Sequence, residues 1–206
     1  MKIHTYSSED AEDVLLVIGE PDSSVFQAPG CYVIGVEIEE QEWNDLLSPW
    51  PAEAVFRKGE PFGGNADRLV QEIDQKIMGN ARDRRGRKYM IGYSLAGLFA
   101  LYYCTRHDWL DGCASVSGSL WYPGWIDYLK HNPVHCSAVY LSVGEAEKNT
   151  KNRQMASVED CTRMSRMILS AYAKTAFELN PGGHFNDPLG RMVRALTKLE
   201  ELVNQD

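Results

Sequence analysis

The chain has 206 residues, a length that fits one domain better than two. Apolar residues make up 44% and charged residues 24%, a composition that excludes a polar, intrinsically disordered chain. The formal net charge is −8, from 21 basic and 29 acidic residues, which argues against a protein whose main task is to bind nucleic-acid phosphates. We expect a single globular domain over residues 1–206 that binds no nucleic acid.

Three further features bear on location and partners. The N-terminal region turns acidic over residues 9–13, where a secretory signal needs an apolar stretch. The longest apolar run, residues 95–104, is too short to span a membrane. The five cysteines include no Cys-x-x-Cys pair, and neither a disulfide framework nor a zinc site is indicated. We expect a cytoplasmic protein with no membrane partner, no metal and no other cofactor, and the oligomeric state stays open.

Short apolar runs alternate with helical patterns along the chain. Strands are predicted at residues 13–18, 31–38, 89–93, 113–116, 137–143 and 175–179. Helices are predicted at residues 65–78, with Asn65 as the cap, and at about 94–106, 157–173 and 188–203. Strands that lack polar alternation and are separated by helices form a parallel sheet covered on both faces. The predicted fold class is α/β, a three-layer sandwich around a mostly parallel sheet of about six strands.

A serine stands between a predicted strand and a predicted helix, in Gly92-Tyr93-Ser94-Leu95-Ala96-Gly97. A nucleophile elbow needs this context, because its sharp turn exposes the serine hydroxyl and requires small residues two positions before and after it. Gly92 and Ala96 meet this need, although Ala96 departs from the strict Gly-x-Ser-x-Gly pattern. The turn also points the N–H of Leu95 toward a forming oxyanion. The alternative is that Ser94 only caps the helix.

A serine hydroxyl needs a base to take its proton, and five histidines compete for this role. His184 lies in Asn180-Pro181-Gly182-Gly183-His184-Phe185, after the last predicted strand, where the chemistry of parallel sheets gathers. Two glycines let this loop turn the imidazole over the sheet. The others lie at the terminus, after a helix end, or in a loop that enters a strand: His4, His107, His131 and His135. His184 is the predicted base, and the alternative is a solvent-facing loop histidine.

The base in turn needs an acid that holds its tautomer and stabilises the imidazolium. The strand between the serine and histidine strands ends in Leu141-Ser142-Val143-Gly144-Glu145-Ala146-Glu147-Lys148. Glu147, three residues after the glycine, is the predicted acid. Glu145 is the close alternative, and a surface charge cluster would explain both.

With these segments, the chain resembles the α/β-hydrolase superfamily, in which the triad follows the order serine, acid, histidine. Within it, the chain resembles the esterase D-like family, which includes S-formylglutathione hydrolases and siderophore esterases. The likeness extends over roughly residues 13–203 and rests on the following segments: Gly92 to Leu98, Ser117-Gly118-Ser119-Leu120-Trp121, Leu141 to Lys148, and Gly182-Gly183-His184-Phe185. It implies a minimal α/β-hydrolase fold without a sizeable lid, and no cofactor.

The resemblance also implies hydrolysis of a small-molecule carboxylic ester or thioester through an acyl-serine intermediate. If Gly19 matches the oxyanion-loop glycine of the family, the second oxyanion donor is the N–H of Glu20. Trp121 and Tyr122 follow a predicted strand and could form an aromatic wall for the substrate, or pack in the core or at the rim. A non-enzymatic binding protein on this fold and a serine peptidase are the alternative functions.

Overall fold

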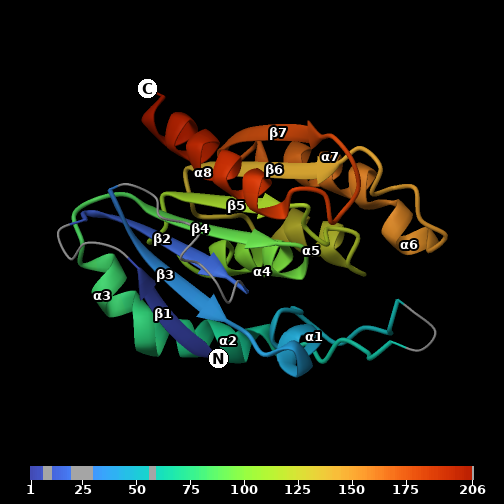
Figure 1. Ribbon diagram of the computed structural model, residues 1–206, viewed down its shortest axis with the longest axis horizontal. Helices are drawn as coiled ribbons and strands as arrows, with labels where there is room; N and C mark the ends of the chain where they lie inside the picture. Colours follow the sequence, from blue (N-terminus) through green and yellow to red (C-terminus); the bar gives the residue numbers. More distant parts are fainter. Residues whose placement is uncertain (7–10, 20–29, 56–58, 206) are drawn as a thin grey trace.

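The computed structural model describes residues 1–6, 11–19, 30–55 and 59–205. A seven-stranded sheet with the order β1-β3-β2-β4-β5-β6-β7 runs through the protein (Figure 1). The edge strand β1 pairs antiparallel with β3, and every other neighbouring pair is parallel. The strands have the following bounds: β1 Lys2–Tyr6, β2 Asp13–Ile18, β3 Cys31–Glu37, β4 Lys88–Tyr93, β5 Gly112–Val116, β6 Ala138–Gly144 and β7 Lys174–Asn180.

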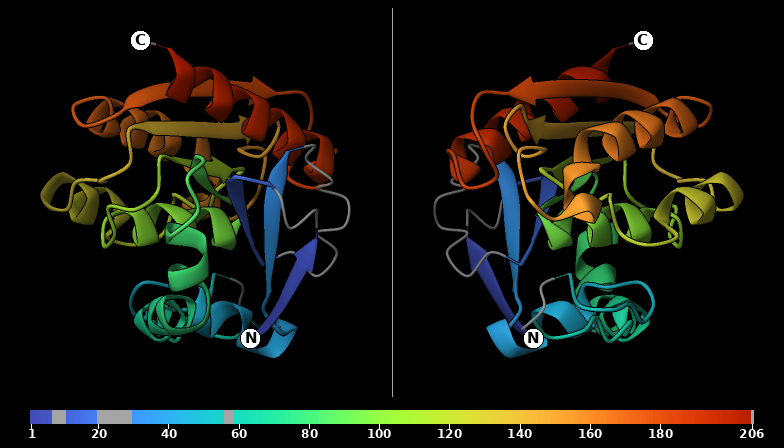
Figure 2. Two further views of the ribbon diagram at one scale, coloured as in Figure 1. Left: turned by 90° about the vertical axis from the view of Figure 1, so that its left-hand side faces the viewer. Right: turned by 90° about the vertical axis from the view of Figure 1, so that its right-hand side faces the viewer.

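Helices cover both faces of the sheet, because successive buried residues of each strand point to opposite sides. In β2, Leu15 and Val17 pack in the core cluster under α8, while Leu16 and Ile18 pack in the cluster under α2 and α4. Figure 2 shows α8 on one side of the sheet and the other large helices across from it. The α-helices are α1 Trp43–Leu46, α2 Ala66–Ile73, α3 Gly79–Arg82, α4 Leu95–Cys104, α5 Trp125–His131, α6 Arg153–Ala156, α7 Val158–Leu169 and α8 Pro188–Asn204.

The predicted fold class is confirmed, and all six predicted strands are present within a residue or two of their expected bounds. The sheet has one strand that was not predicted, β1, so that His4 lies within the sheet, where its Nε2 is 2.7 Å from Glu37 Oε2. Asn65 is the N-cap residue of α2, as predicted, but its side chain accepts no hydrogen bond from the helix. Its amide instead donates to Asp45 Oδ1 at 2.8 Å.

Two helical regions also differ from their predictions. The helix predicted to end at Met78 continues through a π-helical segment, Asp74–Met78, into α3. Residues 125–131, which were not predicted to be helical, form α5 and include His131. No helix in the described part of the chain combines the length and the apolar character that a membrane crossing requires.

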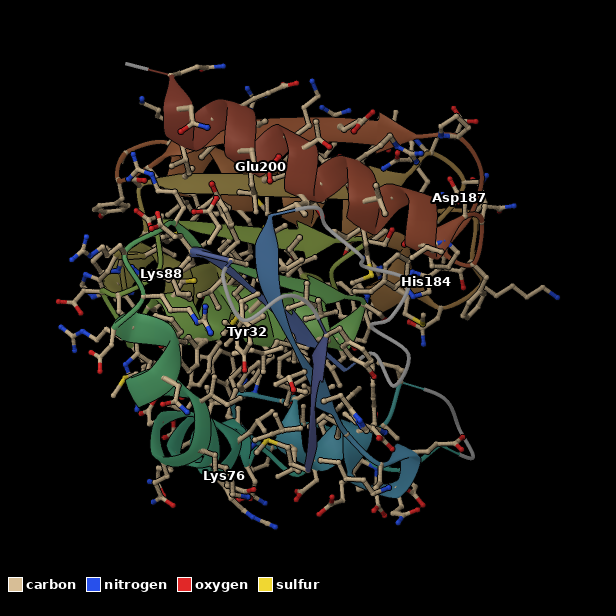
Figure 3. The ribbon with its side chains drawn as sticks, turned by 60° about the vertical axis from the view of Figure 1, so that its left-hand side comes forward. Tyr32, Lys76, Lys88, His184, Asp187 and Glu200 are labelled. Carbon is tan, nitrogen blue, oxygen red and sulfur yellow. The ribbon has the colours of Figure 1, made fainter. Side chains whose placement is uncertain are left out.

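The parallel topology decides where a site can form. Figure 3 shows His184 and Asp187 at one end of the sheet, and Lys88, the first residue of β4, at the opposite end. The carboxyl ends of the parallel strands therefore lie on the side of His184. Loops that follow β4, β6 and β7 meet there, as expected for an open parallel sheet.

Candidate active site

Ser94 occupies a tight turn between β4 and α4, with φ 58° and ψ −124°. Positive φ is costly for a residue with a side chain, so the surrounding packing must impose it. A Cβ atom on Gly92 would lie 2.1 Å from the carbonyl oxygen of Ala96, and only glycine fits there. Among the described residues nothing accepts the N–H of Leu95, so this donor is open at the start of α4.

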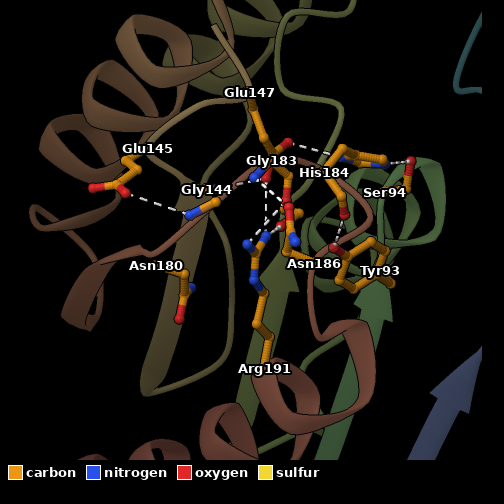
Figure 4. A network of polar contacts seen from close by, with 12 residues as sticks. Tyr93, Ser94, Gly144, Glu145, Glu147, Asn180, Gly183, His184, Asn186 and Arg191 are labelled. Atoms are coloured by element: carbon orange, nitrogen blue, oxygen red, sulfur yellow. Dashed lines mark hydrogen bonds and ion pairs between the residues drawn. The ribbon is translucent and has the colours of Figure 1, made fainter. Parts of the chain in front are cut away.

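The structure brings Ser94, His184 and Glu147 together in a hydrogen-bonded row (Figure 4). His184 Nε2 lies 3.0 Å from Ser94 Oγ, and His184 Nδ1 lies 2.7 Å from Glu147 Oε2. Glu145 does not take part in this row; its side chain turns toward the N–H of Gly182, at 3.5 Å. Of the two carboxylates that the sequence left open, Glu147 is therefore the one that contacts the imidazole.

Glu147 is held in place within the protein, and its side chain is only 4% exposed. The N–H of Gly144 donates to its Oε1 at 2.6 Å, and a buried arginine, Arg191, lies 3.2 Å from the same oxygen. Burial would raise the pKa of Glu147, but the hydrogen bonds from His184 and from the Gly144 N–H outweigh burial and leave the pKa below its usual value. Glu147 is thus a carboxylate near neutral pH and can stabilise a positive charge on the imidazole.

Similar folds occur in several solved structures of hydrolases. An IroE-like serine hydrolase from Shewanella oneidensis superposes with a TM-score of 0.74 at 14% identity, over 95% of this chain and 73% of that one. Siderophore hydrolase EstA from Aspergillus nidulans gives 0.67 at 18% identity, over 94% and 83% of the two chains. The enterobactin esterase FES from Shigella flexneri gives 0.71 at 17% identity, over 97% and 59%.

This chain has the α/β-hydrolase fold. In sequence it is 26% identical over 132 residues to the uncharacterised protein YbbA of Bacillus subtilis, a match that spans 60% of this chain and 52% of YbbA. The chain therefore covers about half the length of this curated relative. No protein-family model matches the chain.

In this α/β-hydrolase fold, the loop that carries His184 is fixed from two sides. The hydroxyl of Tyr93, next to Ser94, donates a hydrogen bond to the backbone carbonyl of His184. Burial raises the pKa of Tyr93, so its hydroxyl keeps the proton that it donates. The N–H of Gly183 donates to Asn186 Oδ1 at 2.7 Å and closes the loop on itself. The imidazole position thus depends on the strand that leads to Ser94.

Ser94 and His184 lie between two cavities. The larger has a volume of about 580 Å³ and a mainly apolar wall, made by the following residues: Ile18, Gly19, Trp43, Tyr93, Ser94, His184, Phe185, Pro188, Leu189 and Met192. The second, of about 330 Å³, is lined by Leu95, Ser119 and Trp121 among others, and Ser94, His184 and Trp43 border both. Two cavities that meet at one hydroxyl can hold the two halves of a cleavable molecule.

The two aromatic residues predicted to contact substrate are placed differently. Trp121 lines the second cavity. Tyr122 lines neither cavity, because its ring is 2% exposed and packs edge-on against Phe62, and its hydroxyl donates to the Trp50 carbonyl at 2.6 Å. Of the two alternatives that the sequence left open for it, Tyr122 thus takes the core position, behind the cavity.

The predicted second oxyanion donor, Glu20, lies outside the described residues. Its predecessor Gly19 lines the larger cavity together with Ser94, and has φ 83°. A Cβ atom on Gly19 would lie 2.6 Å from the Trp43 ring and 3.1 Å from the Ala96 Cβ, so the end of β2 approaches the elbow closely.

Sequence reasoning missed two contributions of α8. Leu189 and Met192 line the larger cavity, whereas apolar residues on a predicted helix indicate no more than a face that packs against the sheet. Arg191, which is 1% exposed and contacts Glu147, also went unnoticed. A charged residue between apolar helix positions gives no local signal that its side chain is buried.

Proposed function

We propose that the protein is a serine hydrolase that cleaves carboxylic ester or thioester bonds through an acyl-serine intermediate. The observation that carries the proposal is the position of His184, which bridges Ser94 Oγ and the Glu147 carboxylate. Nucleophile, base and acid come from the ends of three different strands of the sheet, and the imidazole is oriented by the acid. The fold shared with serine hydrolases and esterases supports the same reaction.

In the proposed reaction, Ser94 Oγ attacks the carbonyl carbon of the ester while His184 Nε2 takes the hydroxyl proton. Glu147 stabilises the imidazolium, and the Leu95 N–H together with the N–H of Glu20 holds the oxyanion. The tetrahedral intermediate collapses, the bond to the leaving oxygen or sulfur breaks, and His184 returns its proton to that atom. Water then attacks the acyl-serine with His184 as the base, which releases the acid and restores Ser94.

The substrate we propose is a small molecule with an apolar group on one side of the scissile bond. The larger cavity offers that group Ile18, Trp43, Leu189 and Met192. The second cavity, with Ser119 and Trp121, would receive the other half. The neighbours named siderophore hydrolase and enterobactin esterase support a small-molecule ester.

The test is a panel of p-nitrophenyl esters of increasing acyl length beside matched thioesters. We expect turnover by the parent protein, and a loss of roughly 10⁴-fold or more in Ser94→Ala with the circular dichroism spectrum unchanged. A fluorophosphonate probe should label the parent at Ser94 only, as mapped by peptide mass spectrometry. Labelling at another serine, or no turnover of any ester or thioester by the folded parent, would overturn the proposal.

A further inference from the structure

Arg191 lies near the start of α8, and its guanidinium points into the protein below the His184 loop (Figure 4). The residue is 1% exposed, so its charge is removed from water. Nη1 donates to Ser117 Oγ at 2.9 Å and to Glu147 Oε1 at 3.2 Å. Nη2 donates to the backbone carbonyls of Pro181 at 2.8 Å and Gly183 at 2.9 Å. Burying an arginine is costly, and these four acceptors offset the cost.

Three of these acceptors belong to the two parts of the site whose relative position matters, the acid and the loop that carries the base. Glu147 follows β6, and Pro181 and Gly183 are the backbone of the loop that presents His184. One rigid, planar group therefore connects the acid to the loop of the base. We call the two coplanar Nη groups of the guanidinium its fork. The ammonium group of a lysine carries the same charge but has no fork, so a lysine at this position could not bond both sets of acceptors at once.

We propose that Arg191 is a positioning residue for the Ser94–His184–Glu147 row, with two separable effects. Its fork fixes the carboxylate of Glu147 and the His184 loop relative to each other. Its positive charge, 3.2 Å from Glu147 Oε1, offsets part of the negative charge that the imidazole faces. This inference rests on the proposed hydrolase function, because both effects are expressed in turnover.

The direction of the charge effect follows from the groups around His184. Glu147 contacts Nδ1, Ser94 Oγ contacts Nε2, and the neutral Tyr93 hydroxyl contacts the backbone carbonyl. The carboxylate favours a proton on the pair, whereas the positive charge of Arg191 opposes it. Without Arg191 the pair holds its proton more tightly. The pH at which activity reaches half its plateau should then rise, by about one unit at the dielectric of a partly buried site.

Two substitutions separate fork from charge. Arg191→Met removes both, and we expect kcat at the plateau to fall about 100-fold, with the midpoint of the pH profile about one unit higher. Arg191→Lys keeps the charge, and we expect the parent midpoint with a kcat about tenfold lower and KM within threefold. Arg194→Met is the matched control: Arg194 lies on the same helix and bonds Asp187 and Asn180, away from Glu147, and its loss should change neither quantity.

A double-mutant cycle shows whether Arg191 acts through the acid. In a Glu147→Gln background the carboxylate is gone but Arg191 still bonds the carbonyls of the His184 loop, so Arg191→Met should lower kcat by clearly less than the 100-fold expected in the parent background. Equal losses in both backgrounds, or the same midpoint shift in Arg194→Met, would overturn the inference. If Arg191→Met does not fold, Arg191→Lys decides alone, and a plateau within threefold of the parent's refutes the positioning role. A parent that hydrolyses esters and labels at Ser94 keeps the proposed function in every one of these cases.

Discussion

The two sides of the candidate site are built by different means. Around Ser94, backbone geometry decides the structure: the turn closes because Gly92 leaves room for the Ala96 carbonyl, and positive φ exposes the hydroxyl. Around His184 and Glu147, side chains decide it, through contacts with Arg191, Tyr93 and the Gly144 N–H. The first arrangement spans six residues, from Gly92 to Gly97, and the second joins β4, β6, β7 and α8.

This difference predicts how each side fails. A change in the glycines that shape the elbow, as opposed to the loss of the Ser94 hydroxyl, should act on folding, because the turn is part of the packing of α4 on β4. A defect in the polar network should act on turnover, since the network holds the imidazole of His184 in position and sets the charge beside it. Variants of each side, each paired with a neighbouring control, test whether the two sides fail in these different ways.

Apart from the loss of the Ser94 hydroxyl itself, the largest effect is expected on the network side. Glu147→Gln keeps the size of the side chain but cannot stabilise the imidazolium, so kcat should fall about 10³-fold. The midpoint of the pH profile should move to lower pH, opposite to the shift expected for Arg191→Met, because a negative charge has been removed. Glu145→Gln is the control and should stay within threefold of the parent. Steady-state kinetics between about pH 5 and 9 measure both quantities, and the reverse ranking would assign the acid to Glu145.

A smaller effect, on stability instead of chemistry, is expected on the elbow side. The added methyl group of Gly92→Ala would collide with backbone atoms of Ala96, and the free energy of unfolding should fall by about 3 kcal/mol. Gly79→Ala is the control: its Cβ meets nothing within 4 Å at the start of α3, and the change should stabilise the protein by about 0.5 kcal/mol. Urea unfolding measures both. A Gly92→Ala protein as stable as the parent would show that the turn tolerates a larger residue.

The same contrast explains what could be predicted from the sequence. The role of Ser94 could be predicted because a strand, a glycine and an apolar helix follow one another in the sequence. The role of His184 could be predicted because two glycines follow the end of a strand. The buried strands could be predicted because each is an unbroken run of mostly apolar residues. β1 was missed because its five residues are mostly exposed and include Lys2 and His4, so it offers no such run.

Contacts between distant segments could not be predicted in this way. Nothing near Arg191 in the sequence shows that its side chain reaches Glu147, 44 positions earlier. Tyr122 follows a strand end, as a cavity residue would, but the turn there directs its ring into the core against Phe62. Glu147 is the acid that the sequence predicts, but Glu145 is set aside only by the turn after Gly144, which directs Glu147 alone at the imidazole.

A further, smaller effect concerns the wall that α8 gives to the larger cavity. Leu189 is 40% exposed and lines this cavity, whereas Val193, 46% exposed on the same helix, does not. Leu189→Ala should raise KM about fivefold for long-chain p-nitrophenyl esters and leave short-chain esters unchanged, because about 1 kcal/mol of apolar contact is lost. Val193→Ala should have no effect on either. Equal changes for both chain lengths would mean that the acyl chain does not lie along α8.

The smallest expected effect is on acid stability, and it tests the network side without any substrate. The pKa of Glu147 is below its usual value in the folded protein, since the hydrogen bonds from His184 and the Gly144 N–H outweigh burial, so the folded state binds this proton less readily than the unfolded chain does. The stabilisation is fully present above the unfolded value of about 4.3, and it is lost as the pH falls through the lower folded value. Between pH 6 and 3, roughly the range over which that proton binds, the free energy of unfolding should fall more steeply in the parent than in Glu147→Gln. Ser94→Ala keeps the carboxylate and should follow the parent. The slopes are measured by urea unfolding at each pH. Identical slopes in all three proteins would show that the partners of Glu147 do not lower its pKa when the protein folds.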